Sequence, residues 1–250
     1  MSRGRLLALA LLAGAAGGVG ATEQPPAATT RATDGAVEAP APPSATGNPA
    51  AEQRRKNILL GRASLADVRK ALTEQDVAAL TNTLHALFAM RWHRGVLHLL
   101  DGLWAGNRAA YPELAWDLIA QPPARVALAS TLNRIQIVDT KAFQDYIRSQ
   151  RDNSHEFVRA QVAVALGFNG DPVDIPLLRS YAEGENRYVV QTAVTGLGLM
   201  ESEQAKQALI DIGNAFTEKE PERSRFVAEV LKRVYHWPPA TPQPPAPQAQ

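Results

Sequence analysis

The chain has 250 residues and a formal net charge of +1 at pH 7. It contains no cysteine, which excludes disulfide bonds, a cysteine nucleophile and thiolate metal sites. So small a net charge gives no reason to expect nucleic acid or an anionic membrane as the main partner.

The first 21 residues have the pattern of a secretory signal. Arg3 and Arg5 form a basic start, Leu6 to Leu12 form an apolar core, and Val19-Gly20-Ala21 is a small-residue cleavage site. Cleavage after Ala21 would remove both arginines and take the net charge from +1 to −1. A retained anchor is the alternative, but a bilayer span needs about 20 strongly apolar residues. We therefore expect an exported bacterial protein, periplasmic or secreted, with no membrane span after cleavage.

Two further segments are predicted to be disordered. Residues 22–56 are rich in Ala, Pro and Thr, contain no aromatic residue and have Val37 as their one sizeable aliphatic before the basic residues at 54–56. Residues 238–250 form a Pro/Gln/Ala tail. Neither segment can bury enough apolar surface to offset the entropy of ordering it. We interpret the first as a linker and the second as an extended terminus.

The rest of the chain is predicted to be helical, with an N-terminal region at 57–122 and repeats at 123–237. Apolar residues recur there at spacings of three and four, and no run alternates as a strand would. The expected helices lie at about 74–90, 94–105, 111–121, 124–135, 140–150, 155–168, 172–183, 187–200, 203–215 and 221–236. Thr73, Thr140, Asp171 and Ser202 are predicted N-caps, and Gly170 a helix end.

An internal repeat runs through the second half of the chain. Val158 to Gly167 (VRAQVAVALG) aligns without gaps on Val189 to Gly198 (VVQTAVTGLG), 31 residues later. A fainter copy starts at Arg125. Periods between about 20 and 50 residues are typical of solenoids, in which stacked helical hairpins share one core. Small residues such as Gly196 are expected to let neighbouring helices approach closely.

The motif Val-Arg-x-x-x-x-x-Ala-Leu-Gly, followed by Gly170-Asp171-Pro172 and Ile175-Pro176-Leu177-Leu178, resembles the HEAT-like repeats first noted in phycobilin lyases. The resemblance covers residues 152–214 and extends partly back to 123, and the second copy has Val190 in place of the arginine. It implies an all-α protein, a right-handed α-solenoid of about four to five hairpins. We expect a scaffold for a protein partner. We expect no enzyme activity and no cofactor, because the chain has no phosphate-binding lysine loop, no Gly-x-Ser-x-Gly motif and no His-Glu-x-x-His helix.

In HEAT-like repeats the second helix of each hairpin usually lines the concave face. The resemblance therefore assigns that face to the helices at about 140–150, 172–183 and 203–215. The outward-pointing candidates for partner binding on them are Gln144, Arg148, Arg179, Glu183, Lys206 and Asp211.

A basic-aromatic cluster lies in the loop between two early helices, formed by Arg91, Trp92, His93 and Arg94. Exposed aromatic and arginine side chains are typical of interface hot spots, so these four residues are candidates for a partner contact. Ordinary loop packing is the alternative.

The alternative function is metal binding or catalysis by His85, His93, His98 and Asp101. His98 and Asp101 are one helical turn apart, but His93 and His98 are five residues apart and would lie on different faces of an unbroken helix. Packing between the early helices is the competing interpretation of these residues. A purely structural domain whose active partner is a separate polypeptide remains a third hypothesis.

Overall fold

The computed structural model describes residues 48–135 and 140–237, and within these ranges it contains helices and loops but no strand. The expected all-α class is therefore confirmed. The signal at 1–21, residues 22–47 of the expected linker and the tail at 238–250 lie outside the described residues. None of the helices in the described ranges is long and apolar enough to cross a membrane.

The described part of the chain folds into twelve α-helices and two 3-10 helices. The first half contains α2 (Pro49–Leu59), α3 (Leu65–Ala71), α4 (Val77–Ala86), η1 (Leu87–Met90), α5 (Arg94–Ala105), α6 (Trp116–Ile119) and α7 (Pro122–Ile135). The second half contains α8 (Lys141–Ser149), α9 (Glu156–Asn169), η2 (Pro172–Asp174), α10 (Ile175–Ala182), α11 (Arg187–Leu199), α12 (Glu203–Phe216) and α13 (Pro221–Tyr235).

Several helix ends are set by the residues expected to cap them. The Ser202 hydroxyl accepts a hydrogen bond from the Ala205 amide, and the Asp171 carboxylate accepts one from the Val173 amide. Gly170 ends α9 in the left-handed conformation at φ 70°, which glycine adopts without steric cost. Thr140 lies at the N-cap of α8, but its side chain makes no capping hydrogen bond.

The prediction that Thr73 caps the helix at 74–90 is wrong. The Thr73 hydroxyl donates to the Lys70 carbonyl at the end of α3, 2.8 Å away. Asp76 caps α4 instead, because its carboxylate accepts from the amides of Ala78 and Ala79. Helix α4 therefore begins three residues later than expected and continues into η1.

The expected disorder is wrong for residues 49–56, which belong to α2. Asn48 caps this helix, Pro49 occupies its first turn, and Arg55 donates to Glu74 across a distance of 2.8 Å. The prediction of a helix at 111–121 is also wrong in extent, since only α6 forms. The chain before α6 is held by tertiary contacts: the Ala115 amide donates to the Leu72 carbonyl, 3.1 Å away.

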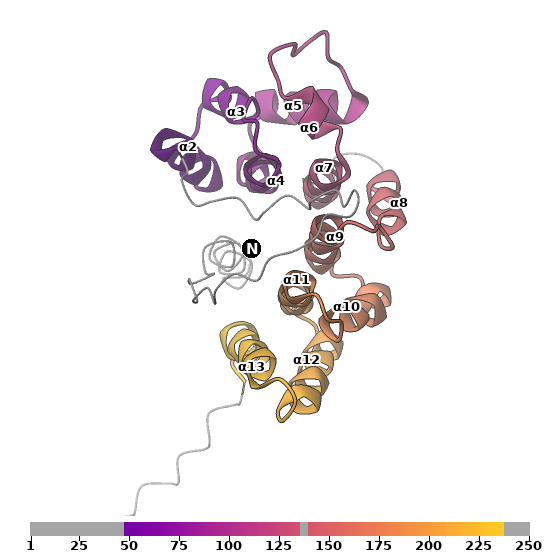
Figure 1. Ribbon diagram of the computed structural model, residues 1–250. Coiled ribbons are helices and arrows are strands. Elements are labelled where there is room, and N and C mark those ends of the chain that lie inside the picture. The colour runs from indigo at the N-terminus through magenta and orange to yellow at the C-terminus, as the bar shows by residue number, and fades with distance from the viewer. Residues whose placement is uncertain (1–47, 136–139, 238–250) are drawn as a thin grey trace, which may run out of the picture.

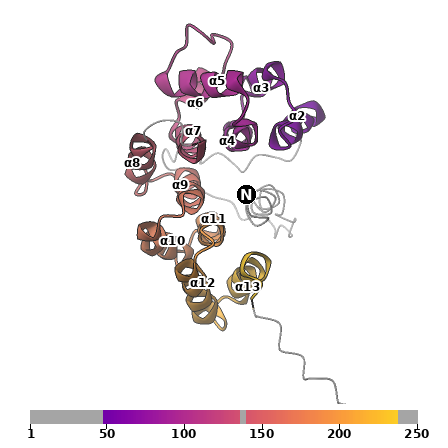
Figure 2. The same cartoon turned by 180° about the vertical axis from the view of Figure 1, so that it is seen from behind.

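The helices form two curved rows (Figures 1 and 2). The inner row consists of α4, α7, α9, α11 and α13, in which each helix contacts the next. The outer row carries α3, α5, α8, α10 and α12 (Figure 1). Successive inner and outer helices pair as hairpins, namely α7 with α8, α9 with α10, and α11 with α12.

The sequence analysis expected the second helices of the hairpins, which are α8, α10 and α12, to line a concave face. This prediction is wrong. These second helices lie on the outside of the curve, and the first helices α7, α9, α11 and α13 lie on its inside (Figure 1). The close packing of the inner helices gives a physical reason. Small residues bring α9 and α11 together, which shortens the inner row relative to the outer one.

Two glycines mark the closest approach within the inner row. A Cβ atom added at Gly167 would lie 2.5 Å from the Cα of Gly196, and one added at Gly196 would lie 2.5 Å from the carbonyl oxygen of Ala163. The repeated residues Val158, Leu166, Val189 and Leu197 are all buried. The aligned segments at 158–167 and 189–198 are thus neighbours that share one core.

The apolar core consists mainly of two clusters that meet at α7. Ala124, Ala127 and Leu128 belong to the cluster of the first half, while Val126 and Ala129 belong to that of the second half. The half-buried side chains of Trp104 and Leu132 pack against both clusters. Helix α7 therefore connects the early helices to the repeats.

Candidate partner-binding surface

Arg148, one of the candidates on the outer helices, bonds to two carboxylates within the chain. Its guanidinium donates to Asp174 through Nε and Nη2, at 3.0 and 2.9 Å, and to Asp171 through Nη2, at 2.7 Å. The hydrogen bonds to Asp174 are the main cause of a raised Arg148 pKa. Because the Asp174 side chain is almost wholly buried, this pair connects α8 to η2 rather than presenting charge to a partner.

Arg179 lies 31 residues after Arg148, on the next outer helix, and likewise contacts an acidic residue of the outer element that follows. It donates to Glu183 at 2.7 Å and reaches Asp211 of α12 at 3.5 Å. The hydrogen bond to Glu183 is the main cause of a raised Arg179 pKa. Each arginine thus contacts the outer element that follows its own helix.

The two remaining candidates also have partners inside the chain. Gln144 donates to the Asn133 side chain at 3.2 Å, and Lys206 pairs with Glu203 at 3.2 Å while lying over the Trp237 ring. All six candidates on the outer helices therefore stabilise neighbouring turns or neighbouring helices.

The histidines named for metal binding do not converge. His85 is buried, with Nε2 3.0 Å from the Gln161 Oε1 of α9. His93 caps α5, because its Nδ1 accepts from the Val96 amide at 3.3 Å. His98 and Asp101 lie exposed on α5. Among the described residues, no group of three His, Asp or Glu side chains is placed to hold a metal ion.

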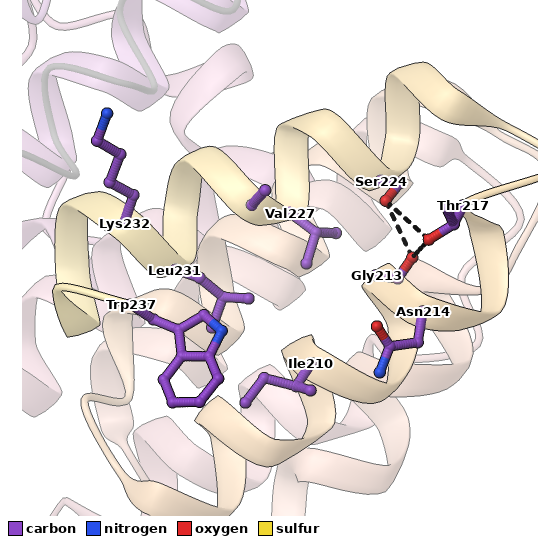
Figure 3. A pocket seen from close by; sticks show the side chains of 10 residues that line it. Ile210, Gly213, Asn214, Thr217, Ser224, Val227, Leu231, Lys232 and Trp237 are labelled. Carbon is purple, nitrogen blue, oxygen red and sulfur yellow. Dashed lines mark hydrogen bonds between the residues drawn. The ribbon is translucent and has the colours of Figure 1, made fainter. Parts of the chain in front are cut away.

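A pocket of about 310 Å³ lies between α12 and α13 (Figure 3). Ile210, Val227, Leu231 and Trp237 form its apolar end. At the other end the hydroxyls of Thr217 and Ser224 both donate to the Gly213 carbonyl, at 2.8 and 3.0 Å (Figure 3). The Ser224 hydroxyl therefore joins α13 to α12, whereas that of Thr217 bonds back within the end of α12. The residues that line the pocket include no His, Asp or Glu that could activate either hydroxyl as a nucleophile.

The loop candidates at 91–94 lie on an exposed corner of the molecule. Trp92 is 82% exposed, the most exposed large apolar side chain in the described ranges. The Arg91 guanidinium carbon lies 4.6 Å from the centre of the Phe88 ring and 5.0 Å from that of the Trp92 ring, and Nη1 donates to the Phe88 carbonyl at 3.2 Å. These contacts place Arg91 beside Trp92.

The turn between α2 and α3 adds two residues to this corner. A Cβ atom at Gly61 would lie 3.2 Å from the Ala89 carbonyl oxygen in η1, so the turn packs directly against the start of the loop. Its Leu60 is 53% exposed, and its Arg62 is exposed as well. We define the Arg–Trp corner as Leu60, Arg62, Arg91, Trp92 and Arg94.

The Arg–Trp corner carries positive charge that is not neutralised by ion pairs. Within the described ranges, none of Arg62, Arg91 and Arg94 forms a salt bridge with an acidic side chain. The sequence predicted Arg91, Trp92 and Arg94 as candidates for a partner contact from their residue types. It missed Leu60 and Arg62, because only the packing of η1 brings them to the loop.

The chain matches no protein-family model. No curated protein matches it either.

Proposed function

We propose that this protein is an exported scaffold that binds another protein and has no catalytic activity of its own. Its repeats would be HEAT-like hairpins stacked as a right-handed α-solenoid, and its compartment would be the bacterial periplasm or the exterior. The repeated hairpins, the buried seam between α9 and α11 and the alignment at a 31-residue offset support this architecture.

The observation that carries the proposal is the exposure of Trp92 beside arginines without acidic partners. A large apolar side chain left in water is costly in a monomer and is favourable once a partner covers it. Tryptophan and arginine are also the residue types that dominate binding energy at protein interfaces. Metal binding by the early histidines is less well supported, because His85 and His93 each serve a separate structural contact.

The test is affinity purification of the epitope-tagged full-length gene product from its native host, after fractionation of the cells. The proposal expects a cleaved protein beginning at Thr22 in the exported fraction, with a protein recovered in fixed stoichiometry. Recovery of the tagged protein alone after mild in-cell crosslinking would contradict the scaffold function. An uncleaved chain in the cytoplasm would contradict the export.

A further inference from the structure

We propose that the Arg–Trp corner binds an acidic segment of the protein partner, with an apolar side chain of that segment packed against Leu60 and Trp92. This inference rests on the proposed scaffold function and specifies where and how the partner is held. It follows from three features of the corner: its charge, the fixed geometry of its cation, and its exposed apolar area.

The charge of the corner selects an anionic partner. Arg62, Arg91 and Arg94 come from two turns that pack against each other, and no acidic side chain in the described ranges pairs with any of them. Arg94 is also the first residue of the twelve-residue helix α5, where the helix dipole adds partial positive charge. Elsewhere most arginines pair with acids, as Arg148 does with Asp174.

The fixed geometry of Arg91 favours a carboxylate. The guanidinium contacts the Phe88 and Trp92 rings at 4.6 and 5.0 Å, and its hydrogen bond to the Phe88 carbonyl uses Nη1. A guanidinium has five N–H donors in a planar fork, so donors remain for a two-pronged hydrogen bond to a carboxylate. Because these ring contacts and the hydrogen bond restrict the side chain before binding, binding costs less side-chain entropy than it would at an arginine without contacts.

The apolar part of the corner favours a protein over a membrane surface. Leu60 and Trp92 are 53% and 82% exposed and lie on the same two turns as the arginines, so they offer apolar area that an apolar side chain of a partner can cover. Anionic lipid surfaces are usually recognised by clusters of about four to eight basic residues. The three arginines here are fewer than that, and the chain as a whole is close to neutral.

The experiment places a photocrosslinking amino acid at position 92 or, as a control, at position 237, in the full-length protein expressed in its native host. We expect position 92 to crosslink a protein segment with several Asp or Glu residues around an apolar residue, and position 237 to crosslink it far less. The double variant Arg91→Glu/Arg94→Glu should lower the yield at position 92 by about tenfold or more. Arg225→Glu, the same charge change at an exposed position on α13, should leave the yield unchanged.

Each other outcome overturns a defined part of the account. Crosslinks at position 92 to a neutral or basic segment, or a yield that Arg91→Glu/Arg94→Glu leaves unchanged, would overturn the acidic partner. Crosslinks to lipid would indicate that the corner binds a membrane instead of a protein. In that case the purified protein would bind phosphatidylglycerol vesicles, and Arg91→Glu/Arg94→Glu would abolish this binding. Protein crosslinks at position 237 alone would agree with the scaffold function but would show that the Arg–Trp corner does not bind the partner.

Discussion

His85 is the buried residue whose ionisation should matter most to the stability of the fold. Burial is the main cause that lowers the pKa of His85 to about 3, the Arg134 guanidinium acts in the same direction, and the hydrogen bond with Gln161 opposes both. The imidazole is therefore neutral in the folded protein at pH 7. Its ordinary pKa of 6.5 applies once the chain unfolds.

The sign of the resulting pH dependence follows from proton linkage. Between pH 6.5 and about 3 the unfolded chain binds a proton at His85 that the folded chain does not, so acidification favours unfolding. Above pH 6.5 the buried His85 does not lower the free energy of unfolding. Below pH 6.5 the free energy of unfolding falls by about 1.4 kcal/mol per pH unit because of this residue. Denaturant titrations at pH 7 and pH 5 measure this effect. We predict that acidification lowers the free energy of unfolding of His85→Gln by roughly 2 kcal/mol less than that of the wild type.

The matched control for His85 is the exposed His98. His98→Gln should retain the pH dependence of the wild type. If His85→Gln and wild type lose the same stability on acidification, the buried imidazole is not the group responsible.

At the scale of single residues, the sequence predicted those features that depend on near neighbours. Ser202 and Asp171 cap as expected because their partners are two or three residues away. Thr73 does not cap the next helix, because its hydroxyl donates to the carbonyl of Lys70 at the end of α3. The partner of His85, Gln161, is 76 residues away, and no local pattern could have identified it.

At the scale of helices, the contact of α9 with α11 depends on having no side chain at two positions. A Cβ atom at Gly196 would lie 2.5 Å from a backbone oxygen of Ala163, which cannot rotate away. We predict that Gly196→Ala lowers the free energy of unfolding by roughly 1–3 kcal/mol, although alanine favours helix formation. Chemical unfolding followed by circular dichroism measures the change.

Gly213 provides the control for this prediction because it also lies within a helix. A Cβ atom there would be 3.4 Å from Val227, an ordinary contact. Gly213→Ala should be neutral or stabilise the protein by up to about 1 kcal/mol. Equal effects of the two substitutions would mean that helix propensity, and not close packing, decides both.

The two arginines on the outer helices should differ in their contribution to stability. Arg148 bonds to Asp174, whose side chain is 6% exposed, whereas the Arg179 and Asp211 side chains are 44% and 41% exposed. We predict that Asp174→Ala costs roughly 1–3 kcal/mol, since it leaves a half-buried guanidinium without its main acceptors. Asp211→Ala should cost under about 1 kcal/mol. A larger loss for Asp211→Ala in the same unfolding assay would contradict this ranking.

The sequence predicted the helices from α7 onward well, and those before α7 only in part. From α7 to α13 each expected helix exists close to its expected range, because the apolar spacing of these helices is regular. Before α7, the expected helix at 94–105 is confirmed as α5. Helix α2 was missed because its composition is polar, and its order depends on a cap and on contacts of Arg54 and Arg55 with Glu74. Long-range contacts of this kind leave no periodic pattern in the sequence.

At the scale of the whole molecule, Trp104 of α5 connects the early helices to the repeats. Its ring lies 5.0 Å from Phe143 and 5.7 Å from Tyr146, both on α8, and the Arg125 guanidinium lies 4.0 Å above it. We predict that Trp104→Ala lowers stability by roughly 3 kcal/mol and separates unfolding into two transitions, one for each main cluster.

Trp237→Ala, two residues beyond the end of α13, should retain a single transition in the same denaturant series. If Trp104→Ala also unfolds in one step, the two clusters are coupled mainly by α7 itself.

The direction in which the rows curve could not be predicted from one sequence. The repeat pattern indicated which residues pack together, and the burial of Val158, Leu166, Val189 and Leu197 agrees with it. The row whose neighbouring helices approach each other more closely lies on the inside of the curve. The contacts of Gly167 and Gly196 bring α9 and α11 of the inner row close together. The candidates on the outer helices were chosen from the usual geometry of the resembled family, and their partners turned out to be intramolecular.

The most direct test of the account is the affinity of this protein for the partner captured at position 92, measured by titration calorimetry. We predict that Trp92→Ala weakens binding by about thirtyfold, with an unchanged free energy of unfolding, because the side chain is exposed in the free protein. Trp237→Ala should bind as wild type does. Equal affinities for Trp92→Ala and wild type would contradict the claim that this corner holds the partner.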